Sequence, residues 1–328
     1  MRPAPSAAER PKVWFVGAGP GAADLLTFRG AAAIAAADVV VWAGSLVSAD
    51  VLVHARRDAE VLDSSALTLE EVAAVYDRAA AGRLVVARVH SGDPTIYGAV
   101  QEQVTECERR GLPWEIVPGV SSLAAAAAVV GRELTIPGVA QSVVLTRLAT
   151  RTSDSMPPRE RVRELARHGT TMALFLSCSR PRALQQELEA GGYPPDTPCA
   201  VVHRATWPDE LVLRCRLGDL AATVRAARIH KQALVLVGPA LADDGARSHL
   251  YHPAFSHEFR RAEAAGPVDR AAPARLQAPG RNLGSGLAPE PPGPPPVGRG
   301  ATARLQGGAR HRGWGLAPEP PGPPGAGP

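Results

Sequence analysis

The sequence predicts an α/β protein with two α/β domains, followed by a tail that does not fold. Short β-branched runs alternate with alanine-rich stretches along the first part of the chain, which is typical of a mostly parallel sheet covered by helices. A second series of such runs follows, whereas the sequence after Phe259 is rich in Pro, Gly, Ala and Arg and lacks core-forming residues. We place a flexible N-terminus at 1–11, domains at 12–118 and 119–242, and a disordered tail at 243–328.

The order of the elements follows from the apolar patterning. In the first domain we expect strands at 13–16, 39–42, 84–89 and 114–117, separated by helices at 25–37, 69–81 and 97–109. In the second domain we expect helices at 122–130, 158–167, 181–190 and 217–227, and strands near Val143, Met172, Cys199, Leu211 and Leu234. In open α/β sheets, ligands bind at the carboxyl ends of the strands.

The tail contains a direct repeat with a period of 29 residues. Residues 274–277 recur at 303–306, and residues 286–295 recur at 315–324. Two copies without core residues cannot form a solenoid. We therefore expect a disordered, polyproline-prone extension, with a Pro-rich recognition segment as the alternative.

Composition excludes several classes of protein. The 36 basic residues nearly balance the 32 acidic ones, and the arginines are scattered, so no nucleic-acid partner is expected. The four cysteines stand far apart without metal-ligand spacing, as buried thiols do in a reducing compartment. No apolar run approaches the roughly 20 residues of a membrane span. We predict a soluble, cytoplasmic protein that has no membrane association and no metal site.

A glycine-rich turn, Gly17-Ala18-Gly19-Pro20-Gly21, directly follows the first strand. The context fits a dinucleotide fingerprint, but that motif also needs an acidic residue at the end of the second strand. Here that strand ends in Ala43-Gly44-Ser45 instead. A nicotinamide-dependent enzyme is therefore disfavoured.

Three further segments combine glycine with polar side chains. Residues 90–98 and 117–122 follow the third and fourth strands of the first domain, and residues 203–210 bring an imidazole, a guanidinium, an indole and carboxylates into one turn. Asp93 can accept hydrogen bonds from a ribose or can simply cap a turn, and residues 121–122 can bind a ligand or cap a helix. Each motif alone leaves both interpretations open.

Together, the order and spacing of these segments resemble the tetrapyrrole methylase family, whose members methylate corrin and sirohaem precursors. The resemblance runs from Lys12 to about Leu241 and has no counterpart in the tail. It is carried by Ala18-Gly19-Pro20-Gly21, Ser91-Gly92-Asp93-Pro94, Val117-Pro118-Gly119-Val120 and Leu236-Val237-Gly238.

Within this family, four segments are similar to the branch that methylates carbon 11 of precorrin-4, or of its cobalt form, to give precorrin-5 in cobalamin biosynthesis. These segments are residues 42–47, 88–94, 131–135 and 204–210. The alternatives are a methylase of another precorrin or of a sirohaem precursor at a different ring carbon, and a binding protein whose tail is the functional part.

The resemblance implies a fold of two α/β domains with S-adenosylmethionine in the cleft between them, and a homodimer. Asp93 would meet the ribose, Ser121 and Ser122 the polar end of the cofactor, and Leu176 and Ala205 the adenine. Carried over by position, the cofactor residues are Pro20, Ser91, Gly92, Asp93, Ile96, Ser121, Ser122, Leu176 and Ala205.

The tetrapyrrole substrate is fringed with carboxylates, for which arginine is a natural partner. The substrate-side candidates are Ser45, Arg88, Arg132, Arg147, Arg204, Trp207 and Glu210. His90 is the candidate catalytic residue, as a proton acceptor after methylation, although a structural histidine fits its position equally well. His249, His252 and His257 are irregularly spaced and are interpreted as solvated side chains rather than metal ligands.

Overall fold

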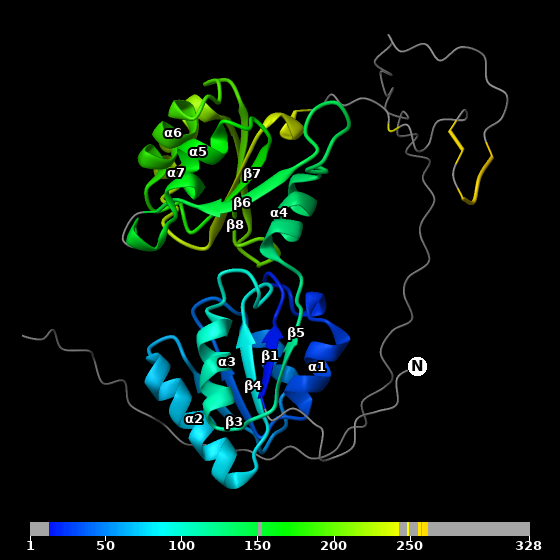
Figure 1. The fold of residues 1–328 in the computed structure, drawn as a ribbon, viewed down its shortest axis with the longest axis vertical. Helices are drawn as coiled ribbons and strands as arrows, with labels where there is room; N and C mark the ends of the chain where they lie inside the picture. Colours follow the sequence, from blue (N-terminus) through cyan, green and yellow to red (C-terminus); the bar gives the residue numbers. More distant parts are fainter. Residues whose placement is uncertain (1–12, 150–152, 243–247, 249–254, 257, 262–328) are drawn as a thin grey trace, which may run out of the picture. The chain divides into compact units, whose positions relative to one another are not determined.

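The computed structural model describes residues 13–149, 153–242, 248, 255–256 and 258–261 (Figure 1). Within these residues the chain forms two five-stranded sheets, each accompanied by helices. The predicted flexible N-terminus, the tail repeat and the three histidines at 249, 252 and 257 lie outside the described residues.

The first sheet is entirely parallel, with strand order β3-β2-β4-β1-β5. Its central strands are almost fully buried and pack against helices through two apolar clusters, as expected for a parallel sheet covered on both faces. The strands are β1 (Val13–Gly17), β2 (Val39–Trp42), β3 (Glu60–Asp63), β4 (Val86–His90) and β5 (Trp114–Val117), and the helices are α1 (Phe28–Ala35), α2 (Leu69–Gly82) and α3 (Val100–Arg109).

The second sheet is mixed, with strand order β6-β7-β10-β8-β9. Strands β6 and β7 are parallel, whereas β10 pairs antiparallel with both β7 and β8, and β8 pairs antiparallel with β9. The last strand in the sequence therefore lies at the centre of this sheet. The strands are β6 (Val143–Arg147), β7 (Thr171–Phe175), β8 (Pro198–His203), β9 (Leu211–Arg216) and β10 (Ala233–Val237).

Four α-helices accompany the second sheet: α4 (Ser122–Val130), α5 (Val162–Ala166), α6 (Pro181–Ala190) and α7 (Leu220–Ala226). Helix α4 begins at the N-cap Ser121, whose hydroxyl accepts a hydrogen bond from the backbone of Leu123, and ends at Gly131 in the left-handed conformation. Short 3-10 helices occupy Ala23–Leu25, Ala49–His54, Ser153–Ser155, Pro158–Glu160, Leu217–Asp219 and Pro239–Leu241.

The predicted α/β class is confirmed, and most elements lie where the sequence placed them. Strand β3 was not predicted, because its burial pattern is mostly exposed and it offers little apolar signal. The helix expected at 97–109 begins only at Val100, since Tyr97 and Ala99 adopt left-handed backbone angles. The division into domains near residue 118 stays a prediction.

Two observations apply only to the residues that the structure describes. None of the helices described is long and apolar enough to cross a membrane. In the same part of the chain, no group of three His, Cys, Asp or Glu side chains is placed to hold a metal ion.

Candidate functional site

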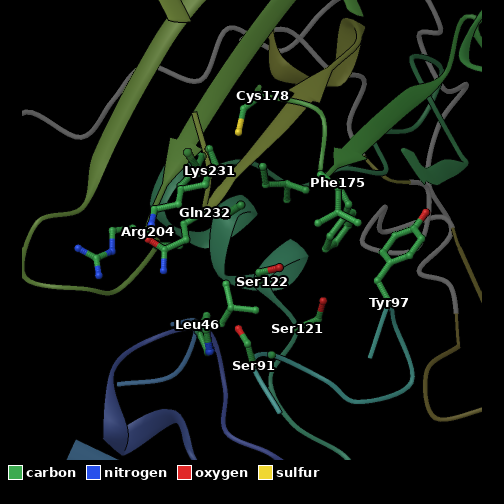
Figure 2. A pocket seen from close by; sticks show the side chains of 18 of the residues that line it. Leu46, Ser91, Tyr97, Ser121, Ser122, Phe175, Cys178, Arg204, Lys231 and Gln232 are labelled. Carbon is green, nitrogen blue, oxygen red and sulfur yellow. The ribbon is translucent and has the colours of Figure 1, made fainter. Parts of the chain in front are cut away.

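A cavity of about 360 Å³ opens at the carboxyl ends of β1, β4 and β5 and extends along residues of the second sheet (Figure 2). Its lining combines glycine-rich loops, the start of α4 and the loops that follow β7 and β8. The lining residues are Pro20, Leu46, Ser91, Gly92, Asp93, Ile96, Tyr97, Ser121, Ser122, Ala126, Phe175, Leu176, Cys178, Val202, Arg204, Ala205, Trp207, His230, Lys231, Gln232, Ala233 and Leu234.

Glycines allow three loops to meet beside this cavity. A Cβ atom at Gly119 would lie 2.2 Å from the carbonyl oxygen of Gly92 and 2.7 Å from the Cα of Gly17. Gly92 also exchanges two backbone hydrogen bonds with Gly19, with N···O distances of 2.8 and 3.2 Å. Only residues without a side chain permit this close backbone approach.

Asp93 connects two of these loops through its carboxylate. One oxygen accepts a hydrogen bond from the backbone N–H of Gly119 at 3.0 Å, and the other accepts from the backbone N–H of Thr95 at 2.8 Å and from the Thr95 hydroxyl at 2.5 Å. A carboxylate has about four acceptor positions. Asp93 can therefore hold the loops together and still accept a hydrogen bond from a ligand.

Ser121 and Ser122 contribute hydroxyls at the beginning of α4, and Figure 2 labels both in the cavity. Ser122 lies next to Gly92, because a Cβ at Gly92 would be 3.5 Å from the Ser122 nitrogen. The first backbone N–H groups of a helix have no partner within the helix and carry a partial positive charge. This end of the cavity therefore suits an anionic or polar group.

The cavity wall beyond β7 is apolar, in contrast to the polar end at the start of α4. Leu176 has a left-handed backbone, with φ of 53°, and remains 67% exposed although it lines the cavity. Phe175 packs against Tyr97 with ring centroids 5.4 Å apart. Burial raises the pKa of the Cys178 thiol, which keeps it neutral. A flat apolar ligand group fits this wall.

Hydrogen bonds join the loop after β8 to the glycine-rich loop after β1. The indole nitrogen of Trp207 donates to the carbonyl oxygen of Pro20 at 2.9 Å, and the backbone N–H of Ala22 donates to the Thr206 hydroxyl at 2.9 Å. A further bond runs from the side-chain amide of Gln232 to the carbonyl oxygen of Ser45, at 2.6 Å. These contacts span the cavity wall.

All nine residues predicted to contact the cofactor line this one cavity, although they come from five separate segments of the sequence. They are Pro20, Ser91, Gly92, Asp93, Ile96, Ser121, Ser122, Leu176 and Ala205. The resemblance to a family grouped these residues, and the fold brings them together in space.

Only some of the residues predicted to contact the substrate line the cavity. Arg204 and Trp207 line the cavity, with the guanidinium carbon of Arg204 at 4.2 Å from the Trp207 ring centroid. Ser45 does not, although its neighbour Leu46 does. The carboxylate of Glu210 accepts a hydrogen bond from the backbone of Thr206 and so serves to shape the loop.

The other three arginines lie outside the cavity lining. Arg132 donates to the carbonyl oxygen of Ala240, and Arg147 donates to the hydroxyl of Ser155. Arg88 is buried in β4, where it donates to the side chain of Gln103 at 2.9 Å, and burial lowers its pKa. The structure thus places Arg88 in the core of the first sheet rather than on a ligand-facing surface.

His90 also lies in the core and outside the cavity lining. Burial, assisted by the charge of Arg88, lowers its pKa to about 3. Its Nε2 atom has no hydrogen-bond partner among the residues that the structure describes. A group with so low a pKa is a weak proton acceptor near neutral pH.

Several lining residues were not predicted from the sequence. Tyr97 belongs to the segment 90–98 that was singled out, whereas Phe175 ends β7; the two rings meet in the lining, where Tyr97 has a left-handed backbone. Lys231, one of only two lysines in the chain, and Gln232 lie in the loop before β10. The rarity of lysine was the one sequence signal that could have indicated Lys231.

Comparison with known proteins identifies the family of this chain. Residues 12–221 match the model of the family described as tetrapyrrole (corrin/porphyrin) methylases. A cobalt-precorrin-4 C(11)-methyltransferase of Methanocaldococcus jannaschii is 45% identical over 251 residues, which is 76% of this chain and 96% of the relative. A precorrin-4 C(11)-methyltransferase of Rhodococcus erythropolis is 48% identical over 240 residues, or 73% of this chain and 96% of the relative.

Solved structures of methyltransferases that act on corrin or porphyrin precursors also resemble this chain. An X-ray structure of a cobalt precorrin-4 methyltransferase, a cobalamin biosynthetic enzyme, superimposes with a TM-score of 0.67 at 44% identity and covers 70% of this chain and 96% of its own. A uroporphyrin-III C-methyltransferase of Thermus thermophilus, complexed with S-adenosylhomocysteine, gives a TM-score of 0.60 at 29% identity and covers 70% and 98%.

Proposed function

This chain belongs to the tetrapyrrole (corrin/porphyrin) methylase family, and from that membership we propose that it transfers a methyl group from S-adenosylmethionine to carbon 11 of precorrin-4. Relatives of 45% and 48% identity, each covered over 96% of its length, are named for this reaction on the cobalt form and on precorrin-4. The chain is thus a C-methyltransferase of cobalamin biosynthesis.

The observation that carries the proposal is the single cavity around the nine predicted cofactor residues. Its volume of about 360 Å³ lies within the range of small-molecule sites, which is roughly 300 to 1,000 Å³. A Rossmann-type nicotinamide site would instead need an acidic residue at the end of β2, where this chain has Ala43 and Gly44.

The residues present fit S-adenosylmethionine at both of its ends. We propose that Asp93 accepts hydrogen bonds from the ribose through its remaining acceptor positions. Ser121 and Ser122, with the backbone N–H groups at the start of α4, would hold the amino-acid end. The apolar wall that includes Leu176 and Ala205 would contact the adenine.

The chemistry requires little acid or base from the protein. S-adenosylmethionine, when bound, supplies a methyl group on a positively charged sulfur. The protein has to orient the reacting ring carbon in line with that methyl group and exclude water. Asp93 is the one carboxylate among the described lining residues, and it is already hydrogen-bonded within the loops. The described lining therefore offers no carboxylate that is free of such bonds, and we propose that Asp93 positions the cofactor rather than transfers a proton.

Two cationic side chains in the lining suit an anionic substrate. Arg204 and Lys231 both line the cavity, and guanidinium and ammonium groups form strong hydrogen bonds with carboxylates. We propose that these residues contact the carboxylate fringe of the tetrapyrrole and that the ring of Trp207 contacts the substrate beside them.

We also propose a homodimer in the cytoplasm. Phe28 of α1 and Val53 of the 3-10 helix at Ala49–His54 are 98% and 78% exposed. These two helices contact each other, and exposed apolar side chains on adjacent elements are candidates for a subunit interface. The four cysteines are free, and three of them are buried, which fits a reducing compartment. Sedimentation of the purified protein tests the dimer directly.

The activity is tested with S-adenosylmethionine carrying a labelled methyl group. Purified protein is incubated separately with precorrin-4, cobalt-precorrin-4, precorrin-3 and uroporphyrinogen III, and the products are analysed by mass spectrometry and NMR. We expect label on carbon 11 of at least one precorrin-4 form. Label transfer to precorrin-3 or uroporphyrinogen III instead would overturn the proposed substrate, and no binding of S-adenosylhomocysteine would overturn the proposed cofactor.

A further inference from the structure

We propose that residues 204–210 form a clamp that holds the cofactor cavity closed, and that Trp207 is a positioning residue within it. The inference depends on the proposed binding of S-adenosylmethionine. It assigns Trp207 a role through its indole N–H group, which is distinct from contact between its ring and the substrate.

The clamp is defined by two hydrogen bonds between segments far apart in the sequence. Trp207 donates to the carbonyl oxygen of Pro20, and Thr206 accepts from the backbone N–H of Ala22, each at 2.9 Å. The sequence separations are 187 and 184 residues. Both bonds join the connection between β8 and β9 to the loop that follows β1.

Close packing accompanies these bonds. A Cβ atom at Gly21 would lie 2.2 Å from the Cδ1 atom of Trp207 and 2.9 Å from the carbonyl oxygen of Ala205. The indole therefore rests directly on the backbone of the glycine-rich loop, and no larger residue fits beneath it. This contact also fixes the direction of the indole N–H group.

Two residues of the clamp have left-handed backbone angles, which neighbouring contacts must stabilise. Arg204 and Thr206 have φ angles of 49° and 67°, and a β-branched residue with positive φ is an outlier that the surrounding structure must stabilise. Glu210 supplies part of that support by accepting a hydrogen bond from the Thr206 backbone at 2.6 Å. Arg204 gives further support to the loop, because its guanidinium lies over the Trp207 ring and forms an ion pair with Asp209.

The position of these bonds explains why they would control ligand affinity. Pro20 and Trp207 are hydrogen-bonded to each other and both line the cavity. Breaking this hydrogen bond would separate the β8–β9 connection from the loop after β1, and these two segments form different parts of the cavity lining. Apparent affinity falls in proportion to the fraction of molecules in the binding-competent state. Loss of the clamp should therefore weaken cofactor binding more than it slows the chemical step.

The test compares substitutions that remove single atoms from the clamp. Trp207→Phe removes the N–H donor and keeps an aromatic ring, and Thr206→Val removes the acceptor and keeps the shape. Thr206→Ser retains the hydroxyl and serves as the rescue variant. Trp114→Phe is the matched control, since Trp114 lies at the start of β5 and outside the cavity lining.

The measurements are the Kd for S-adenosylhomocysteine by calorimetry, the KM for S-adenosylmethionine, kcat, and hydrogen exchange of the peptide that contains Ala22. We expect Trp207→Phe and Thr206→Val to raise Kd and KM about 5- to 30-fold, with kcat changed less than about twofold. The amide of Ala22 should exchange faster in Thr206→Val. Thr206→Ser and Trp114→Phe should behave as the wild type.

Wild-type affinity in both Trp207→Phe and Thr206→Val would overturn the clamp. A lower kcat with unchanged Kd and KM for the cofactor would also overturn it, because the indole N–H group of Trp207 would then affect the chemical step and not cofactor binding. If the wild-type protein itself does not bind S-adenosylhomocysteine, the proposed cofactor is wrong, and the clamp fails with it. If Trp207→Phe does not fold, the comparison of Thr206→Val with Thr206→Ser decides the question.

Discussion

Replacing Gly119 by alanine tests how the three loops beside the cavity are packed. The added methyl group would lie 2.2 Å from the Gly92 carbonyl oxygen and 2.7 Å from the Gly17 Cα, and each of these neighbours is a backbone atom. A flexible side chain could move away from the methyl group, but here β1, β4 or β5 must shift. Overpacking of this kind typically costs about 1 to 3 kcal/mol of unfolding free energy.

For a folded region of this size, each kcal/mol lowers Tm by roughly 2 to 4 °C, so we expect a decrease of about 2 to 12 °C in a calorimetric scan. Affinity for S-adenosylhomocysteine should fall as well, because the Gly119 N–H group donates to Asp93. Gly218→Ala is the control, since a Cβ there makes only ordinary contact, at 3.4 Å from Pro195. Equal Tm values for the two variants, within about 1 °C, would refute the packing argument.

Three further predictions follow from the site and the sequence. Asp93→Ala should weaken S-adenosylhomocysteine binding by about 1 to 3 kcal/mol in calorimetry, and unchanged affinity would remove Asp93 from the site. His90 has a pKa of about 3 in the folded protein against an ordinary 6.5, so on acidification the unfolded chain binds the proton first. The free energy of unfolding should therefore fall by about 2 kcal/mol between roughly pH 6.5 and 5. His90→Gln should reduce this pH dependence, as measured by urea titration. Deleting residues 262–328 should leave Tm and cofactor affinity unchanged, and a large decrease in either would contradict the expectation of a disordered tail.

The cavity residues beside the first sheet could be predicted because their geometry depends on local features that the sequence displays. Gly19, Gly92 and Gly119 each follow a strand of the first sheet, and strands in a parallel sheet bring their carboxyl ends to one edge. The resemblance to a family then assigned a ligand to that edge. Leu176 and Ala205 follow strands of the second sheet, and they were assigned by resemblance alone.

The substrate side was harder, because it depends on which face of each element is buried. Arg88 and His90 alternate along β4 with residues of the opposite face, and a five-residue strand buried throughout gives no sign of which face meets the ligand. The antiparallel pairing of β10 likewise follows from tertiary contacts rather than from its apolar sequence. Lys231 and Gln232 reach the cavity only as a result of that pairing.

The central place of β10 also sets the order in which the chain can assemble during synthesis. All strands of the first sheet are present once residue 117 has been made, and each pairs with strands from that same stretch. The second sheet is different, because β7 and β8 are joined only through β10, which ends at Val237. A growing chain can therefore fold its first sheet early, whereas β6–β7 and β8–β9 remain separate pairs with open edges until β10 emerges. Such edges can pair with other chains, so this interval is the stage of biosynthesis at which the protein is most vulnerable to aggregation.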